Sequence, residues 1–349
     1  MKKISIIGAG PSGLTAAINL SKQGYSVQVF EKNENCGMRF HGDFQGLENW
    51  SAPLDILDEL KAMNIAIDFW HKPVIESEFF DFRQTKRTVK FEKPGLYLIK
   101  RGAIEGSLDL ALKEQALKSG VEIIFKKRVS EKEGDIIAMG PRRVDGIVRG
   151  MSFETNEEHV PMIILDDTLA PKSFAYLLTS EGRGCLGTGL TNRYTMANEY
   201  FSRTLDTFKK MLNLEIVGGH MFTGYFNFFV MNNYEQHKKL YIGECAGLQD
   251  LLFAFGLRQA MTSGYLAARS IINDESYDYL IKERFYQQLQ TSIVNRFLFS
   301  LMGNRGYSVF LKKGRSVKNP VRRMYKQYNS SFAKRIMLPL ANLYLKNKT

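Results

Sequence analysis

The chain has little cysteine and no long apolar run. Its 349 residues contain three widely spaced cysteines, Cys36, Cys185 and Cys245, with no CxxC pair among them. An odd number of cysteines without a framework favours reduced thiols and a cytoplasmic setting. No apolar stretch reaches the roughly 18 to 20 residues that a membrane-spanning helix needs. We therefore expect a globular cytoplasmic protein whose membrane contact, if any, is peripheral and at the inner face.

Signatures of several enzyme classes are also missing. The sequence has no HExxH motif and no acid cluster at metal-ligand spacing, so we expect no metal site. It also lacks the G-x-S-x-G elbow of the α/β-hydrolases and the lysine signature of a P-loop. These absences argue against metal-dependent, serine-hydrolase and P-loop chemistry.

Acidic residues are nearly absent from the C-terminal fifth of the chain. Residues 281–349 carry 15 Lys or Arg against one acid, Glu283, whereas the net charge of the whole chain is +12. Such an asymmetry points to a phosphate-bearing partner, either a membrane surface or nucleic acid. No nucleic-acid recognition motif accompanies the charge, so nucleic acid is the weaker candidate.

The same segment has an amphipathic helical pattern. Apolar residues recur at helical intervals at Phe285, Leu289, Ile293, Phe297 and Leu301. The basic stretch "KKGRSVKNPVRRMYKQY" follows, and then "FAKRIMLPLANLYL". A basic face opposite apolar residues is typical of a helix that lies in a membrane interface, where anionic lipids attract Lys and Arg. A solvated basic face on an ordinary helical domain fits the pattern as well.

A glycine motif stands at the start of the chain. The stretch "KKISIIGAGPSGLTAAINLSKQGYSVQVFEK" admits two interpretations, a secretory signal or a strand, turn and helix that hold a dinucleotide. A buried strand, "ISIIG", leads into GxGxxG, in which Gly8 makes the turn and Gly10 lets the pyrophosphate approach. Gly13 lets the helix pack closely on the sheet, and Pro11 and Ser12 complete the cofactor turn.

The residues after this motif favour the dinucleotide. One helical face is apolar, and its members are Leu14, Ala17, Ile18 and Leu20. Gly24 is placed to end the helix. A second strand then ends at Glu31, whose carboxylate can accept hydrogen bonds from a ribose and would repel a 2′-phosphate. We assign Lys32 to the same site, and no A-x-A cleavage pattern follows.

A second motif lies far downstream, in "KLYIGECAGLQDLLFAFGLRQAMTSGYLAARSI". We expect a strand over 240–242, a loop, and a helix over 256–272. A helix N-terminus that opens from a glycine-containing loop suits an electron-rich group. An ordinary strand–helix unit with a glycine-rich loop is the alternative. Two such motifs, near the two ends of one chain, favour FAD over NAD.

The second motif resembles the second FAD contact of the p-hydroxybenzoate-hydroxylase-like flavoproteins. The matching positions are Gly243, Ala246, Gly247, Gly256, Ala260, Ser263 and Gly264. By this resemblance, Glu244 binds the ribityl chain of FAD. The helix that starts near Gly256 and Leu257 would point at the pyrimidine edge of the flavin.

Within that superfamily the chain most resembles geranylgeranyl reductases, flavoenzymes that saturate isoprenoid double bonds. Three stretches carry the likeness, namely "GMRFHGDF", "YLIKRGAIEGSLDLALKEQALKSGVEIIF" and "PKSFAYLLTSEGRGCLGTGL". The likeness covers most of residues 1–275. It implies that Arg39 belongs to the cofactor site, that Arg101 lies over the FAD phosphates, and that Tyr176 belongs to the substrate-domain sheet.

Departures from the family pattern bear on the reaction. His41 replaces the cysteine of a C-G-D motif and is followed closely by Asp43. Its imidazole could act as a general acid, and a histidine that only bonds a loop is an equal alternative. Ala254 and Phe255 replace a glycine–acid pair, so Phe255 would make the flavin region more apolar. His41, Asp43 and Phe255 are the candidate catalytic residues.

Aromatic residues alternate in "GGHMFTGYFNFFVM", residues 218–231. The pattern suits one wall of a large apolar cavity for an isoprenoid or acyl chain, or the plain core of a sheet. Phe226 and Phe228 from this stretch, together with Tyr176, are the predicted substrate contacts.

These features predict an α/β protein with a Rossmann-type FAD-binding domain, an inserted antiparallel-sheet substrate domain and a basic helical C-terminus. The FAD domain would comprise 1–68, 97–150 and 235–275, the substrate domain 69–96 and 151–234, and the helical segment 276–349. Alternation in "EFFDFRQTKRTVKFEKPGLYLI" predicts a hairpin in the substrate domain.

The expected activity is FAD-dependent reduction of double bonds in a hydrophobic, isoprenoid-like or other lipid-like substrate, by hydride transfer from reduced flavin. The sequence leaves the electron donor open between NAD(P)H and ferredoxin. One alternative is a flavin monooxygenase that acts on an aromatic or polyketide-like substrate. Another is a protein that holds flavin or lipid without redox turnover. An anionic membrane surface is the further expected partner.

Overall fold

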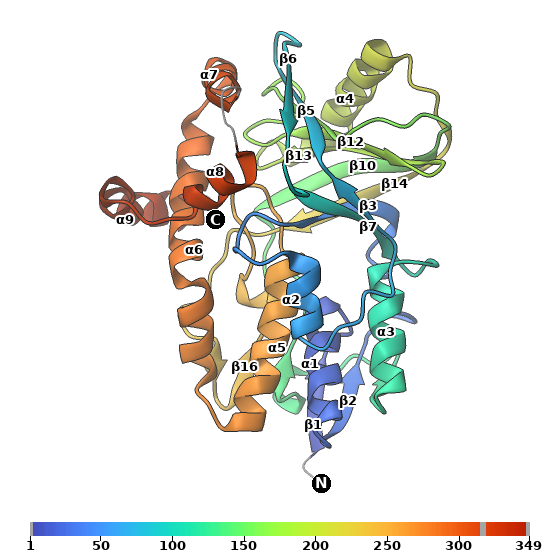
Figure 1. The fold of residues 1–349 in the computed structure, drawn as a ribbon, viewed down its shortest axis with the longest axis vertical. Helices are drawn as coiled ribbons and strands as arrows, with labels where there is room; N and C mark the ends of the chain where they lie inside the picture. Colours follow the sequence, from blue (N-terminus) through green and yellow to red (C-terminus); the bar gives the residue numbers. More distant parts are fainter. Residues whose placement is uncertain (1–2, 315–318, 347–349) are drawn as a thin grey trace.

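The computed structural model describes residues 3–314 and 319–346. A mainly parallel sheet lies at one end of the molecule and a mainly antiparallel sheet at the other (Figure 1). The long C-terminal helix α6 (Tyr277–Leu301) runs along one side of both (Figure 1). The predicted α/β class and helical C-terminus are confirmed for the residues described.

The parallel sheet has six strands and forms the N-terminal core. Its spatial order is β15 (Glu235–Gln236), β16 (Lys239–Tyr241), β9 (Ile136–Ile137), β1 (Lys3–Ile7), β2 (Ser26–Phe30) and β8 (Glu122–Ile124). All neighbours are parallel except β15 and β16. The β-branched residues of β1 are buried on both faces, as a central parallel strand requires.

Three helices pack on this sheet: α1 (Pro11–Lys22), α3 (Leu108–Lys118) and α5 (Leu257–Asn273). Of these, α1 and α5 confirm the helices predicted in the two glycine motifs. The contact between α1 and α5 is close, because a methyl group at Gly264 would overlap the carbonyl oxygen of Ser12. Both helices therefore approach each other through small residues.

The antiparallel sheet has seven strands. Its order is β14 (Val217–Phe226), β10 (Gly146–Glu154), β13 (Arg183–Leu190), β12 (Ala175–Ser180), β11 (Met162–Leu165), β5 (Glu76–Asp81) and β6 (Lys86–Lys90). The helix α4 (Ala197–Leu212) packs on it. The predicted hairpin is the β5–β6 pair. The domain boundary predicted at residue 150 falls inside β10, all of which pairs with β14 or β13.

A third, three-stranded sheet lies between the other two. It is built from β3 (His41–Glu48), β7 (Leu96–Gly102) and β4 (His71–Val74), in that order. After β3 the chain turns into the short helix α2 (Ile56–Ala62), capped by the side chain of Asp55. Short 3-10 turns complete the chain at η1 (Glu131–Glu133), η2 (Tyr194–Met196) and η3 (Gly243–Ala246).

The described residues of the C-terminal segment form four helices. They are α6 (Tyr277–Leu301), α7 (Asn304–Gly314), α8 (Pro320–Gln327) and α9 (Phe332–Lys346). In α6, Ile293, Val294 and Phe297 are buried against Leu251 and the end of β14. Across residues 3–314 and 319–346, the structure contains no helix of sufficient length and apolarity to span a bilayer. All three cysteines are buried free thiols.

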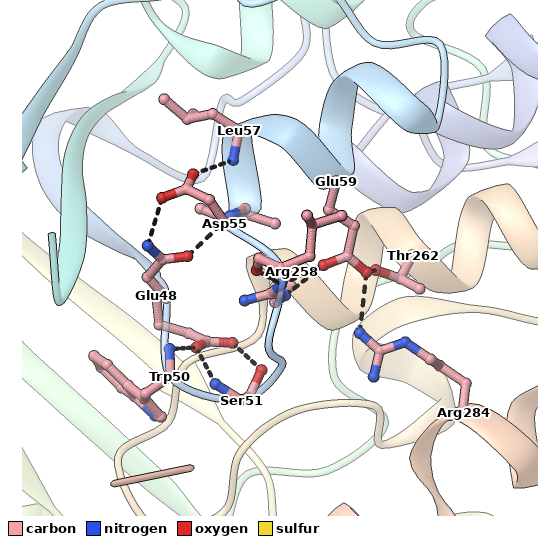
Figure 2. A network of polar contacts seen from close by, with 12 residues as sticks. Glu48, Trp50, Ser51, Asp55, Leu57, Glu59, Arg258, Thr262 and Arg284 are labelled. Atoms are coloured by element: carbon pink, nitrogen blue, oxygen red, sulfur yellow. Dashed lines mark hydrogen bonds and ion pairs between the residues drawn. The ribbon is translucent and has the colours of Figure 1, made fainter. Parts of the chain in front are cut away.

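A buried ion-pair network joins α2, α5 and α6 (Figure 2). Glu59 of α2 accepts hydrogen bonds from Arg258 Nε at 2.7 Å and from Arg284 at 3.0 Å. Arg258 is 1% exposed and also donates to the carbonyl oxygen of Leu54 at 2.6 Å. Burial raises the pKa of Glu59, but the two guanidinium groups outweigh it and the net pKa is lowered. The ionised pair therefore stabilises the fold.

We expect Glu59→Gln to lower the free energy of unfolding by about 3 kcal/mol, because it leaves the buried Arg258 charge without its counter-ion. The loss should be greatest near neutral pH and should shrink as the pH falls through the lowered pKa of Glu59, where wild type loses the same charge. Urea unfolding at several pH values measures both effects.

The matched control is Asp58→Asn, one position away on the same helix. Asp58 pairs with Lys61 at 3.5 Å, and both side chains are more than half exposed. Its removal should change the unfolding free energy by less than about 0.5 kcal/mol. Equal losses for both variants would contradict a special role for the buried pair.

Candidate dinucleotide-binding site

The first glycine motif forms a tight turn between β1 and α1. Gly8 has φ +107°, and a methyl group there would overlap the carbonyl oxygen of Ala138 on the neighbouring β9 loop. A methyl group at Gly13 would overlap the carbonyl oxygen of Gly8. At Gly10, by contrast, a methyl group would meet nothing within 4 Å. Two glycines are thus required by the fold itself, whereas Gly10 keeps open a space that a pyrophosphate can approach.

Glu31 lies at the end of β2, beside this turn. Its carboxylate accepts hydrogen bonds from the Ala9 backbone N–H at 3.0 Å and from the backbone and side chain of Asn33 at 2.9 and 2.8 Å. The side chain is oriented by these donors and lies where an acid of this fold accepts ribose hydroxyls. Lys32 follows it and is exposed.

The second motif meets the first one at Ser12. Gly243, the first residue of η3, has φ +65°, and a methyl group there would lie 2.6 Å from Ser12 Oγ. Its N–H donates to Ser263 Oγ of α5 at 3.0 Å. Gly247 has φ +75°, and its Cα faces the backbone of Phe229. The two glycine motifs, predicted from opposite ends of the chain, therefore form one site.

Arg39 and Glu244, both predicted in the cofactor site, form an ion pair at 2.7 Å. Arg39 also donates to the carbonyl oxygen of Tyr225 on β14. This pair connects the loop before β3 with η3 and with the seven-stranded sheet. Its formation was not predictable from the sequence, because the two residues are 205 positions apart.

Arg101, expected over the phosphates, is instead enclosed by protein. It is 4% exposed and makes a bidentate ion pair with Asp109 of α3, at 2.8 and 3.0 Å. It also donates to Gln45 at 2.7 Å and lies 4.1 Å from the centroid of the Phe40 ring. These contacts hold β7, α3 and the loop before β3 together.

The two polar candidates of β3 lie in different environments. His41 is exposed, and its ring centroid lies 4.2 Å from that of His220 on β14. Asp43 is 4% exposed and accepts a hydrogen bond from the His41 backbone N–H at 3.0 Å. Burial raises the pKa of Asp43, against the opposing effects of that hydrogen bond and of Arg101. No sequence signal pointed to His220, because its place beside His41 depends on tertiary packing.

The predicted substrate residues fall into two places. Tyr176 of β12 packs over Gly187 of β13. Burial raises the pKa of Tyr176 and of the neighbouring Cys185. Phe226 and Phe228 are buried together, with ring centroids 5.6 Å apart, in a cluster with α6 and α9. Their contacts favour the alternative of a plain core for these two residues.

Phe255 lies at the N-terminal end of α5, where it contacts β3. Its ring packs edge-on against Trp50 with centroids 4.8 Å apart, and a methyl group at Gly46 would lie 2.5 Å from it. The preceding Ala254 has φ +59°, a left-handed conformation that glycine adopts more easily. The family pattern has glycine at this position, and the backbone here adopts a conformation that suits glycine.

A cavity of about 480 Å³ lies between α2, α6 and α8. Ser51, Leu54, Arg284, Tyr325 and Tyr328 are among its lining residues. Glu48 fixes the loop at its rim by accepting hydrogen bonds from the backbone of Trp50 and of Ser51 (Figure 2). Trp50 therefore connects this wall of the cavity with Phe255 at the start of α5.

The residues present fit a dinucleotide. Gly10 leaves space beside the first turn, and some buried polar atoms near the second turn lack partners among the described residues. Arg39 Nε and both amide atoms of Gln259, in the first turns of α5, are buried without a hydrogen-bond partner among the described residues. Buried groups of this kind are satisfied in native proteins by a ligand or by water. No cluster of potential metal ligands occurs in the described part of the chain.

The comparison with solved structures identifies the fold. A geranylgeranyl bacteriochlorophyll reductase-like protein from Thermoplasma acidophilum matches with a TM-score of 0.71 over 100% of both chains, at 17% identity. This chain has the fold of the geranylgeranyl reductase-like flavoproteins. A flavoprotein/dehydrogenase from Cytophaga hutchinsonii matches with a TM-score of 0.64 over 100% of both chains, at 14% identity. The flavin-dependent brominase Bmp2 matches with a TM-score of 0.63 over 99% of both chains, at 14% identity.

The matches to known sequences are short. Residues 6–46 match the family described as NAD(P)-binding Rossmann-like domain. A 1-hydroxycarotenoid 3,4-desaturase from Flavobacterium is 40% identical over 81 residues, which are 23% of this chain and 16% of that protein. Thiamine thiazole synthase from Thermotoga maritima is 38% identical over 77 residues, which are 20% of this chain and 31% of that protein. The chain thus spans less than a third of these curated relatives.

We expect Gly10→Ala to reduce the bound cofactor at least about tenfold without unfolding the protein, because its methyl group would enter the space left for the pyrophosphate. Gly303→Ala is the control, since a methyl group there meets only Asp167 at an ordinary 3.8 Å, in the connection between α6 and α7. Cofactor titration by fluorescence, with circular dichroism of both variants, makes the comparison. Equal affinity in the two variants would contradict the assigned site.

We expect Asp43→Asn to gain stability relative to wild type as the pH rises. Burial raises the pKa of Asp43 in the folded state. The wild-type protein therefore loses stability as the pH rises from the unfolded-state pKa of this carboxyl to its folded-state pKa, whereas asparagine does not titrate. Urea unfolding of both proteins at about pH 4 and about pH 8 tests the sign. A difference between the proteins that stays constant with pH would refute it.

Proposed function

We propose that this protein is an FAD-dependent oxidoreductase that reduces double bonds in a hydrophobic, isoprenoid-like substrate. The observation that carries the proposal is the meeting of both glycine motifs at Ser12, with Gly243 and Gly264 packed against it. A single dinucleotide motif is common to NAD and FAD proteins, whereas a second contact at the start of α5 suits the longer, two-part FAD.

Each part of FAD has candidate partners in the site. The turn from Gly8 to Gly13 and the carboxylate of Glu31 would hold the adenosine half. Arg39 and Glu244 would exchange their mutual ion pair for contacts to the middle of the molecule, and the backbone at Gly256 and Leu257 would face the ring end. When bound, FAD supplies hydride-transfer chemistry.

The chain would contribute a proton donor and an apolar surface that excludes water. His41 is exposed beside His220, so an imidazole nitrogen can hold a proton between the three-stranded and the seven-stranded sheet. Asp43 fixes the backbone at that position by accepting the N–H of His41. Phe255 and Trp50 cover the start of α5 with apolar surface, which excludes water from the reacting region.

The choice of substrate class draws on two kinds of support. The fold is shared with a geranylgeranyl bacteriochlorophyll reductase-like protein, and two curated relatives that match part of the chain are a 1-hydroxycarotenoid 3,4-desaturase and a 4,4'-diapophytoene desaturase. Isoprenoid compounds thus appear in the names of these three proteins. The fold also occurs in 2-methyl-3-hydroxypyridine-5-carboxylic acid oxygenase, so oxygen-dependent hydroxylation is the alternative that an experiment must exclude.

Anaerobic spectroscopy separates these reactions. The purified protein would be loaded with FAD, reduced with dithionite, and mixed with a prenyl lipid in the absence of oxygen. We expect the oxidised flavin spectrum to return on addition of the lipid, together with a product two hydrogens heavier. Return of the spectrum only on admission of oxygen would support a monooxygenase and contradict the proposal.

We expect His41→Gln to lower the rate of lipid-dependent reoxidation about a hundredfold, a usual contribution of a general acid, while FAD binding is unchanged. His237→Gln, at an exposed turn between β15 and β16, is the matched control and should leave the rate unchanged. A rate within about twofold of wild type for His41→Gln would remove His41 from the mechanism.

A further inference from the structure

Helix α9 has one apolar face that is buried and a second one that is exposed. Ala341 and Leu345 are 0% and 5% exposed and pack in a cluster with α6 and the end of β14. The opposite face carries a row of large apolar side chains, which we call the α9 row: Phe332, Ile336, Leu340 and Leu343, exposed by 80%, 63%, 57% and 54%. The spacing of three to four residues places them on one side of the helix.

The α9 row projects away from the body of the protein. The helices α6 to α9 lie together on one side of the molecule, and α9 extends outward from α6 (Figure 1). The inner face is anchored by Tyr344, whose ring lies 5.2 Å from that of Phe297. Four exposed apolar side chains on an anchored, protruding helix form an interaction surface, because single exposed apolar residues are common but a continuous row is not.

The segment that carries the α9 row is basic. Residues 304–346 contain no Asp or Glu. The cations of this region that are classed as exposed are Arg305, Lys312, Arg322, Lys326 and Arg335. Arg335 is adjacent to Ile336, so charge and apolar surface meet on the same helix. Lys334 lies on the inner side, where it donates to the carbonyl oxygen of Gln327 and burial lowers its pKa.

We propose that α9 lies in the interface of an anionic membrane, with the α9 row among the lipid chains and the cations of α7 to α9 at the lipid phosphates. An apolar row flanked by Lys and Arg is the pattern of interfacial helices. The charge argues against a second copy of this chain as the occupant, because a symmetric α9 contact would bring two basic surfaces together. The membrane contact is independent of the reaction proposed above.

The test measures binding of the full chain to sedimented vesicles. We compare vesicles of phosphatidylcholine alone with vesicles that contain about 30% phosphatidylglycerol. We expect strong binding to the anionic vesicles, at least about tenfold weaker binding to the neutral ones, and a decrease with added NaCl. Equal binding to both compositions, or no binding to either, would overturn the proposal.

Two variants assign the surface. Ile336→Gln/Leu340→Gln should reduce binding to anionic vesicles at least about tenfold, because it removes half of the α9 row. Tyr279→Gln/Tyr286→Gln is the matched control, since these residues of α6 are 63% and 59% exposed, and it should bind like wild type. Circular dichroism should show equal folding of both variants.

Light scattering of the same proteins without vesicles tests whether a second copy of the chain covers the α9 row. A wild-type dimer that the α9 variant converts to monomer, with vesicle binding unaffected, would show that a second copy covers the row and would overturn the proposal. A wild type whose mass stays near the 39.9 kDa of one chain supports it.

Discussion

The arrangement of the whole molecule depends on the close approach of α1 and α5 at Ser12. Gly243 and Gly264 come from a segment more than 200 residues downstream, and any larger side chain at either position would push the two glycine motifs apart. This contact brings the N-terminal ends of two helices to the same edge of the six-stranded sheet, where the dipoles of both favour an electron-rich ligand. The cofactor proposal follows from this constraint more than from either motif alone.

Two buried ion-pair networks hold other helices and strands near the contact between α1 and α5. Glu59 connects α2 with α5 and α6 through two arginines, and Arg101 connects β7 with α3 through Asp109. Both pairs are buried, so each charge depends on its partner. These contacts fix the C-terminal helices relative to the cofactor site. The outer face of α9 remains exposed.

Much of this was predictable from the sequence, for reasons that can be stated for each element. The first strand, α1, α5 and the β5–β6 hairpin follow from local periodicity and glycine positions, which act over a few residues. Strand β10 crosses the domain boundary predicted at residue 150, because strand pairing is decided by distant partners, here β13 and β14. The ion pair of Arg39 with Glu244 and the contact of His41 with His220 could not be predicted either, because each joins residues that are far apart in the sequence. The core position of Phe226 and Phe228 could not be separated from a cavity wall by alternation alone, since both patterns repeat every second residue.

The most direct test of the account is the flavin content of the purified protein. The protein would be reconstituted with FAD, freed of excess ligand, denatured, and the released flavin identified by its fluorescence before and after phosphodiesterase treatment. We predict roughly one FAD per chain, with fluorescence that rises when the dinucleotide is cleaved. A protein that retains no flavin, or that retains NAD in its place, would contradict the central claim that the two glycine motifs form one FAD site.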